Sequence, residues 1–217
     1  MSANLMSLAR SGGKFLKLFG DRKMVKTMPS ARDYVQDGLA FIVDDTFETL
    51  ETERYDFVLD SPIAPDSDFT VEICCEIEDD GTDGVIHNAR MLIGKSTLSC
   101  LGFAWFSASA YNTLNLQTGS YRWSLGNQPI FSKNTYGAVS TNGESPSSSF
   151  IHGGNVTYAG PAFLEWKINN EIHIGKLLGN KNGFRGKVFN VRIYSRALTA
   201  DEIVHNYAID KARFGIP

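Results

Sequence analysis

Apolar and polar residues alternate most clearly between positions 69 and 78. One parity holds Phe69, Val71, Ile73, Cys75 and Ile77, and the other holds Thr70, Glu72, Cys74, Glu76 and Glu78. A period of two is the period of a β-strand, because successive side chains point to opposite faces of a sheet. The alternation predicts a strand with one buried face and one face in water.

The stretch from 188 to 194 has apolar residues on both parities. Val188 and Tyr194 share one parity, and Phe189, Val191 and Ile193 share the other. A strand with two apolar faces is typical of a sheet that is covered on both sides. This pattern therefore predicts a central strand of a layered structure.

A helix is predicted directly after this strand. Thr199 and Glu202 have the T-x-x-E spacing of a capping box, in which the hydroxyl and the carboxylate each accept a backbone N–H at the helix start. Leu198 and Ile203 are placed to form a hydrophobic staple across that start. We expect the helix to begin at about Ala200.

Further apolar runs separated by turn residues predict more short strands. They cover 39–43, 55–59, 91–95, 101–106 and 121–125, and a hairpin is expected from 162–168 and 171–174. The acidic stretch 44–53 and the polar stretch 142–149 are expected to be a connection and an exposed loop. With 217 residues, 42% of them hydrophobic, the chain can bury a full core, so we expect one all-β sandwich domain plus an appendage.

Three segments resemble one family. The run 184–203, F-R-G-K-V-F-N-V-R-I-Y-S-R-A-L-T-A-D-E-I, is similar to the closing signature of laminin-G-like, concanavalin A-like jelly rolls, and 34–39 and 69–72 are similar to earlier strands of such domains. The resemblance covers roughly 34–207, although 80–165 matches by strand rhythm alone. It implies a two-sheet antiparallel jelly-roll sandwich with a short C-terminal helix, of the kind found in phage or prophage virion proteins and bacterial surface proteins.

Charge divides the chain into two predicted parts. Residues 1–28 hold six cations against one aspartate, a net +5, which leaves −8 on the other 189 residues of a chain with a net charge of −3. We interpret 1–28 as a basic docking arm and 29–217 as the jelly-roll domain. The residues expected to dock the arm are Arg10, Lys14, Phe15, Lys17, Phe19 and Lys23. An acidic protein surface, nucleic acid and an anionic membrane face all suit such an arm, and the apolar anchors favour a protein partner.

The sequence contains no run of about 18 apolar residues that would span a membrane. Lys14 and Lys17 interrupt the one apolar patch near the N-terminus, so we expect no secretory signal. Cys74 and Cys75 are neighbours that would point to opposite faces of a strand, which leaves Cys100 as the distant partner for either. We expect free buried thiols and folding in a reducing cytoplasm.

Catalytic and metal-binding patterns are weak. Related jelly-roll scaffolds host glucanases, but Glu76 and Glu78 do not reproduce the E-[ILV]-D-x-x-E run of those enzymes, and the four histidines are scattered. His173, between two isoleucines, is expected on a sheet surface. Calcium would suit the carboxylates Asp79, Asp80 and Asp83, yet their spacing fits no EF-hand and a hairpin tip explains them equally well. We expect no enzyme activity and no cofactor.

Aromatic and amide side chains in turn-rich segments are the candidates for binding, because sugars stack on rings and hydrogen-bond to amides. Trp105 and Trp123 are expected in the core. The residues kept as loop candidates for a ligand are Tyr111, Asn134, Tyr136 and Tyr158.

These patterns favour a non-enzymatic, lectin-like module of a larger oligomeric assembly. The leading hypothesis is a phage virion component, a head decoration, head fibre or tail fibre, assembled in the host cytoplasm. Its arm would hold other virion proteins, and its domain would contact host-surface glycan or protein. A bacterial carbohydrate-binding module at the cell surface or outside the cell is the alternative, and a cryptic glycoside hydrolase is the third hypothesis.

Overall fold

The computed structural model describes residues 32–49, 55–59, 61–78, 88–94, 102–107, 113–118, 121–124, 133–160, 171–175 and 185–217. Its strands are β1 (Leu39–Val43), β2 (Phe47–Thr49), β3 (Tyr55–Val58), β4 (Phe69–Ile77), β5 (Asn88–Gly94), β6 (Gly102–Ser107), β7 (Thr113–Thr118), β8 (Tyr121–Ser124), β9 (Lys133–Thr141), β10 (Ser147–His152), β11 (Asn155–Gly160), β12 (Glu171–Ile174) and β13 (Gly186–Tyr194). One helix, α1 (Ala200–Phe214), follows the last strand.

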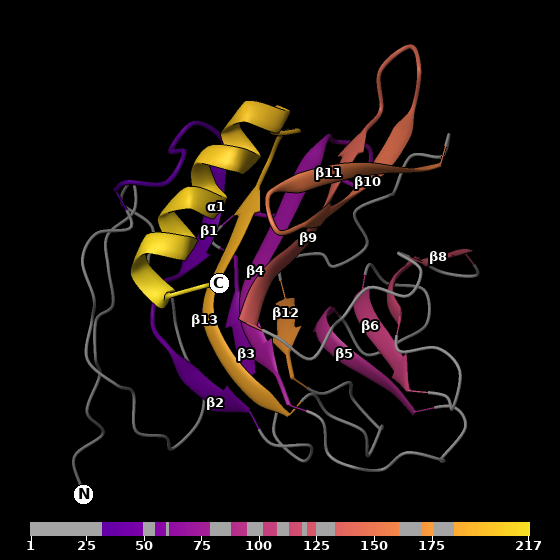
Figure 1. The fold of residues 1–217 in the computed structure, drawn as a ribbon. Coiled ribbons are helices and arrows are strands. Elements are labelled where there is room, and N and C mark those ends of the chain that lie inside the picture. The colour runs from indigo at the N-terminus through magenta and orange to yellow at the C-terminus, as the bar shows by residue number, and fades with distance from the viewer. Residues whose placement is uncertain are drawn as a thin grey trace, which may run out of the picture.

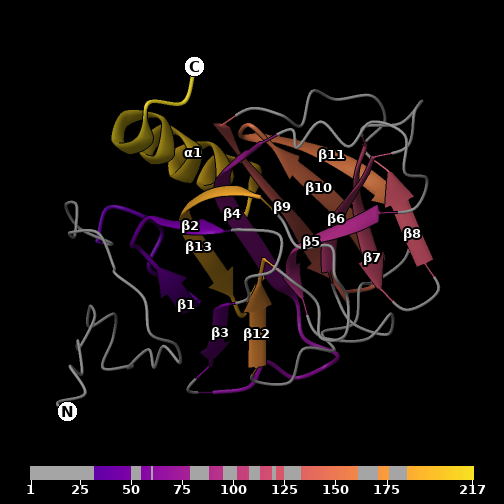
Figure 2. The same ribbon diagram turned by 90° about the horizontal axis from the view of Figure 1, so that it is seen from below.

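The strands form two antiparallel sheets that face each other (Figure 1, Figure 2). The seven-stranded sheet has the order β1-β13-β4-β9-β10-β11, with β2 also paired to β13, and the six-stranded sheet has the order β3-β12-β5-β6-β7-β8. The first and last of the described strands, β1 and β13, are therefore neighbours. Strands from both halves of the sequence build each sheet, and the fold closes only when the C-terminal third is in place.

The main core lies between the sheets. Val71 and Ile73 of β4 and Val191 of β13 point inward, where they meet Phe57 of β3 and Ile172 of β12. All five side chains are almost completely buried. The predicted buried parity of 69–77 is confirmed.

The other face of β4 is not in water, so that part of the prediction is wrong. Thr70, Glu72 and Cys74 are fully buried, because α1 packs on the outer face of the seven-stranded sheet. Only the end of the strand is accessible, with Glu76 partly buried and Glu78 exposed. A helix that lies far away in the sequence decides this burial.

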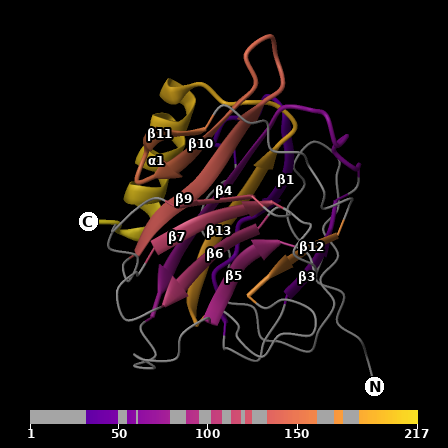
Figure 3. The ribbon, with the colours of Figure 1, turned by 90° about the vertical axis from the view of Figure 1, so that its right-hand side faces the viewer.

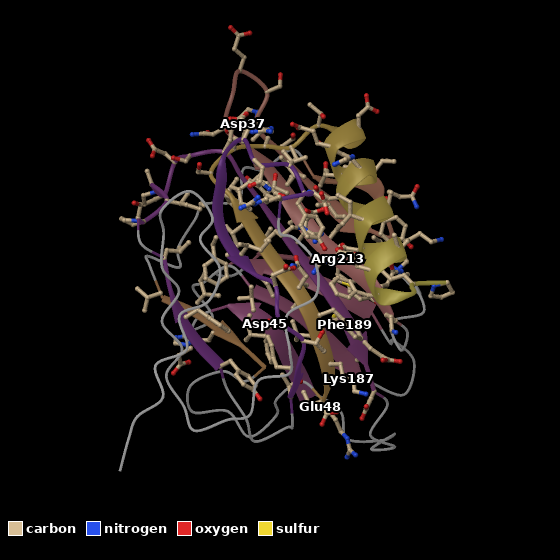
Figure 4. The ribbon with its side chains drawn as sticks, turned by 90° about the vertical axis from the view of Figure 1, so that its left-hand side faces the viewer. Asp37, Asp45, Glu48, Lys187, Phe189 and Arg213 are labelled. Atoms are coloured by element: carbon tan, nitrogen blue, oxygen red, sulfur yellow. The ribbon has the colours of Figure 1, made fainter. Side chains whose placement is uncertain are left out.

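β13 also departs from its predicted parity. The strand lies between β1 and β4 and is covered on both faces, as expected. However, its pairing with β4 shifts between Val188 and Asn190, which is a β-bulge at Phe189. Val188 consequently shares the inner face with Val191 and Ile193, whereas Phe189 turns to the outer side and packs with Phe214 of α1 (Figure 4).

The predicted start of α1 is confirmed. The Thr199 hydroxyl accepts the Glu202 backbone N–H at 3.3 Å, and the Glu202 carboxylate accepts the Thr199 N–H at 2.8 Å. Leu198 and Ile203 are buried in one cluster, as the staple requires. Arg196 hydrogen-bonds to the same carboxylate and lowers the pKa of Glu202 to about 2, so the cap stays ionised at neutral pH.

The remaining element predictions succeed in part. The strands expected at 39–43, 55–59, 91–95, 101–106, 121–125 and 171–174 are present with small changes of boundary. The sequence patterns did not predict β2, β7, β9, β10 and β11. The loop expected over 142–149 is shorter, because Ser147–His152 is a strand. Segment 162–168 of the expected hairpin lies outside the described residues.

Cys74 and Cys75 are free, buried thiols on opposite faces of β4, as predicted, and Cys100 lies outside the described residues. Within the described part of the chain, no helix is long and apolar enough to cross a membrane.

Val191→Ala removes two methyl groups from a fully buried position between the sheets. We expect a loss of about 2 to 4 kcal/mol in the free energy of unfolding, because the cavity cannot collapse in a closed sandwich. Thr199→Ala removes only the cap and should cost about 1 kcal/mol. Denaturant titrations of both variants measure the difference, and equal losses near zero would mean that β13 and α1 do not hold the fold together.

Candidate functional site

A buried cluster of charged and polar side chains lies between α1 and the seven-stranded sheet. At its centre, Arg192 of β13 is fully buried. Its Nε donates to Glu72 Oε2 of β4 at 2.9 Å, and its two terminal nitrogens donate to the two carboxylate oxygens of Asp210 of α1 at 2.7 Å each. A two-pronged pair of this geometry is among the stronger ionic contacts in proteins.

Neutral donors complete the cluster. Tyr34 and Thr135 donate their hydroxyl protons to Asp210 at 2.8 and 2.7 Å, and Asn206 Nδ2 donates to Glu72 Oε2 at 2.7 Å. The guanidinium of Arg192 also lies 4.2 Å from the centre of the Tyr34 ring. Five separate parts of the chain therefore meet in this cluster: the segment before β1, β4, β9, β13 and α1.

A second ion pair extends the cluster toward β1. Arg213 near the end of α1 donates to Asp44 Oδ1 at 2.7 Å and to the Tyr34 hydroxyl at 3.0 Å. Asn190 Nδ2 donates to the same Asp44 oxygen at 2.8 Å. Figure 4 shows Arg213 beneath α1, beside β13.

Burial shapes the titration of these groups. Burial raises the pKa of Glu72, and Arg192 opposes that shift by attraction. For Arg192 itself burial would lower the pKa, but Asp210 and Glu72 outweigh burial and raise it, so this guanidinium remains charged. Because helix and sheet seal these side chains, we interpret the cluster as the attachment of α1 and not as a place for a substrate.

The carboxylates and imidazoles considered for catalysis are dispersed. Glu78 pairs with Arg185 at 3.3 Å at the end of β4. His173 is buried, not on a sheet surface as predicted, and its Nδ1 lies 2.6 Å from Asp56 Oδ1. His152 and His205 contact Asn134 and a backbone carbonyl. Among the described residues, no group of three His, Cys, Asp or Glu side chains is arranged to hold a metal ion.

Several predicted site residues fall outside the described residues. They are Tyr111, the calcium candidates Asp79, Asp80 and Asp83, and the arm residues Arg10, Lys14, Phe15, Lys17, Phe19 and Lys23. The division into 1–28 and 29–217 accordingly stays a prediction.

Of the remaining ligand candidates, Tyr136 was predicted in a loop, and this prediction is wrong. It lies in β9, not in a loop, and is fully buried in the main core, because its strand crosses the middle of the sheet. Asn134, at the start of β9, is half-buried, and its Nδ2 donates to His152 Nε2 at 3.3 Å. Burial lowers the pKa of His152, which favours the neutral ring that this bond requires.

Tyr158 is the candidate that the structure leaves accessible. It lies on β11, the edge strand of the seven-stranded sheet, and 62% of it is exposed. Its cross-strand partner is Ser149, and Val156 pairs with Ile151. Since Ile151 packs in the cluster beneath α1, Tyr158 and Val156 face the side of the sheet on which α1 lies.

Two residues that the sequence reading missed complete this surface. Val204 of α1 is 54% exposed and Val156 is 38% exposed; with Tyr158 they are the exposed large apolar side chains among the described residues. Tyr207 of α1 lies against Gly154 in the turn between β10 and β11, so this flank of the helix faces β11. Figure 3 shows α1 beside β10 and β11. We call Val156, Tyr158 and Val204 the β11 surface.

The β10–β11 turn fixes where this surface lies. Gly153 and Gly154 have φ of 58° and 76°, which glycine adopts without strain and which two-residue hairpin turns require. A Cβ on Gly154 would lie 2.6 Å from the Tyr207 ring. The Gly-Gly pair was the sequence signal that could have predicted the hairpin.

No protein-family model matches the sequence, and no curated protein matches it. Solved structures do match. The receptor-binding domain of botulinum neurotoxin type G is 12% identical with a TM-score of 0.58, over 96% of this chain and 52% of that one. Domain 4 of AbnA, an extracellular arabinanase from Geobacillus stearothermophilus, in complex with arabinotriose, is 13% identical with a TM-score of 0.55, over 91% of this chain and 90% of that one.

Trypanosoma rangeli sialidase, in complex with a difluoro sugar analogue, is 15% identical with a TM-score of 0.53, and 76% of this chain matches it. This chain spans only 27% of the length of that enzyme. Identities this low show the fold alone. The fold is an antiparallel two-sheet jelly-roll sandwich with one C-terminal helix, as predicted, and the N-terminal arm lies outside the described residues.

Arg192→Met leaves Glu72 and Asp210 buried without their counter-charge. We expect the free energy of unfolding to fall by about 3 to 5 kcal/mol. Arg185→Met is the matched control, because its pair with Glu78 is exposed and should contribute less than about 1 kcal/mol. Chemical denaturation of both variants compares them, and similar small losses would show that the buried cluster does not attach α1.

Proposed function

We propose that this protein is a non-enzymatic, lectin-like binding module in which Tyr158 stacks on a saccharide. The observation that carries the proposal is the exposed ring of Tyr158 on a regular strand. A sugar ring presents C–H groups on its faces, and a flat aromatic side chain can cover them.

The setting of Tyr158 suits this role. Its backbone belongs to the β10–β11 ladder, so the ring needs little ordering when a ligand arrives, and lost ordering entropy is one of the main costs of binding. Ser149, the cross-strand partner of Tyr158 on β10, is half-buried on the same face of the sheet. Its hydroxyl group can hydrogen-bond to a sugar hydroxyl next to the stacked ring.

Similarity to a sugar-bound domain supports the proposal. The arabinanase domain that matches this chain over nearly the whole length of both was solved with arabinotriose. A domain of this fold can thus hold a saccharide. In this chain His173 is buried beside Asp56, and His152 and His205 contact an amide and a backbone carbonyl, an arrangement that we take as support for binding without catalysis.

We further propose that the module is displayed on a larger assembly, most specifically a phage virion, through its basic N-terminal arm. Support comes from the charge difference between 1–28 and the rest of the chain and from the position of the domain start. Val35 donates its N–H to Asn206 of α1 and is followed closely by β1, which is one edge strand of the seven-stranded sheet. Tyr158 lies on β11, the opposite edge strand of that sheet, so an arm anchored beside β1 would leave its ring accessible.

A carbohydrate-binding module at a bacterial surface or outside the cell is the alternative. In this alternative the protein also binds a saccharide, but it is not part of a virus particle. Detection of the protein on purified particles favours the virion role, whereas glycan binding with no particle association favours the alternative. Release of reducing sugar that is lost in Glu76→Gln would instead support the glycoside hydrolase hypothesis.

Tyr158→Ala removes the stacking ring. A stacked ring contributes about 1 to 3 kcal/mol, by analogy with stacked bases, so the dissociation constant for a bound glycan should rise roughly fivefold or more. Glycan-array screening followed by calorimetry measures the change. Tyr158→Trp keeps an aromatic face and should retain binding.

The unfolding midpoint of Tyr158→Ala should stay unchanged, because the side chain is exposed. A lower midpoint would mean that Tyr158 supports the fold. Unchanged affinity for a glycan that does bind would mean that the saccharide contact lies elsewhere.

Deletion of residues 1–28 tests the display role separately. The truncated protein should remain folded and keep its glycan affinity, because neither depends on the arm, but it should no longer be incorporated into particles. Near-ultraviolet circular dichroism and particle sedimentation report the two properties. Loss of the folded signal, or incorporation at the full level, would contradict the assigned role of the arm.

A further inference from the structure

We propose that the β11 surface selects neutral saccharides over those that carry carboxylate, sulfate or phosphate groups. This inference rests on the proposed function and adds the class of ligand. It comes from the distribution of charge along and around the strands that form the surface.

The segment 134–160, which supplies most of β9 and all of β10 and β11, contains a single charged residue, Glu144. Across the whole chain, 21% of residues are charged, so a segment of this length would ordinarily hold five or six. Glu144 is exposed in the connection between β9 and β10, and its negative charge would repel an anionic ligand rather than attract one.

The helix supplies no cation close to Tyr158. Val204, Tyr207 and Lys211 follow one another at helical spacing on the flank of α1 that faces β11. Lys211 Nζ lies 5.8 Å from the centre of the Tyr207 ring, near the β10–β11 turn. It is seven residues beyond Val204, about 10 Å along the helix axis.

Five other described cations are engaged with carboxylates. Arg185 pairs with Glu78, Lys187 with Glu48, Arg192 with Glu72 and Asp210, Arg196 with Asp37 and Glu202, and Arg213 with Asp44. Lys133 donates to the Phe214 carbonyl at the end of α1. The guanidinium groups of Arg192, Arg196 and Arg213 are thus engaged within the fold.

An anionic sugar would lose water on this surface without gaining a counter-charge. An ion that is desolvated without a partner is strongly disfavoured, and a charge-assisted hydrogen bond needs a charged donor. A neutral sugar needs only a ring to stack on and uncharged donors and acceptors. Tyr158 supplies the ring, and Ser149, its cross-strand partner on the same face, supplies a hydroxyl group beside it.

The test compares matched glycans that share a neutral backbone and differ by one terminal sialic acid or one sulfate. We expect the full-length protein to bind the neutral member at least about tenfold more tightly. Raising the salt concentration from low to physiological should leave that affinity unchanged, because no ion pair contributes. Surface plasmon resonance on immobilised glycans measures both quantities.

Ser149→Arg places a cation across the ladder from Tyr158. This variant should bind the anionic member at least about fivefold more tightly than the native protein does, and it should make that binding salt-dependent. Ser149→Gln is the uncharged control of similar reach and should leave the preference unchanged. Circular dichroism confirms that both variants are folded.

The outcomes separate this inference from the proposed function. Tighter binding of the anionic glycan by the native protein, lost in Tyr158→Ala, would overturn the neutral preference and leave the lectin-like function standing. Equal affinity for both members would also overturn the preference. Binding to neither class across a broad array would overturn the proposed function itself.

Discussion

The burial of one arginine sets the constraints on the rest of the structure. Arg192 lies beneath α1 with no exposed surface, and it is tolerable there only because Glu72 and Asp210 supply opposite charge and well-directed acceptors. The two carboxylates come from a central strand and from the C-terminal helix. Helix, β13 and β4 must therefore be in register at the same time, since a displaced helix would leave a charge buried alone.

The same cluster connects the two ends of the domain. Tyr34 and Asp44, which flank β1, contact Asp210 and Arg213 of α1. Beneath α1, the outer face of the sheet thus holds this polar cluster alongside two apolar clusters, and the main core lies on the other side of β4 and β13. One flank of α1 is fixed to the start of the domain and the other lies along the β10–β11 hairpin, which leaves Tyr158 at the edge of a rigid frame.

The β11 surface combines a rigid backbone with very few charged side chains. The ionic groups on the described outer face concentrate beneath α1 or pair near β1 and β13, whereas β9 to β11 are almost free of charge. A binding surface of this kind depends on shape, ring stacking and neutral hydrogen bonds. Charged side chains thus stabilise the fold, and uncharged side chains form the proposed binding surface.

The sequence by itself determined the local structure of this protein. The period of two in 69–77, the capping box at Thr199 and Glu202 and the apolar run of β13 depend on neighbours within a few residues, and these predictions are confirmed. Only the tertiary structure decided which faces are wet. Whether Glu72 is buried, whether Phe189 turns outward at a bulge and whether Tyr136 or Tyr158 is accessible depend on strands and a helix that are distant in the sequence. Local periodicity carries no information about what covers a face, because that is set by long-range packing.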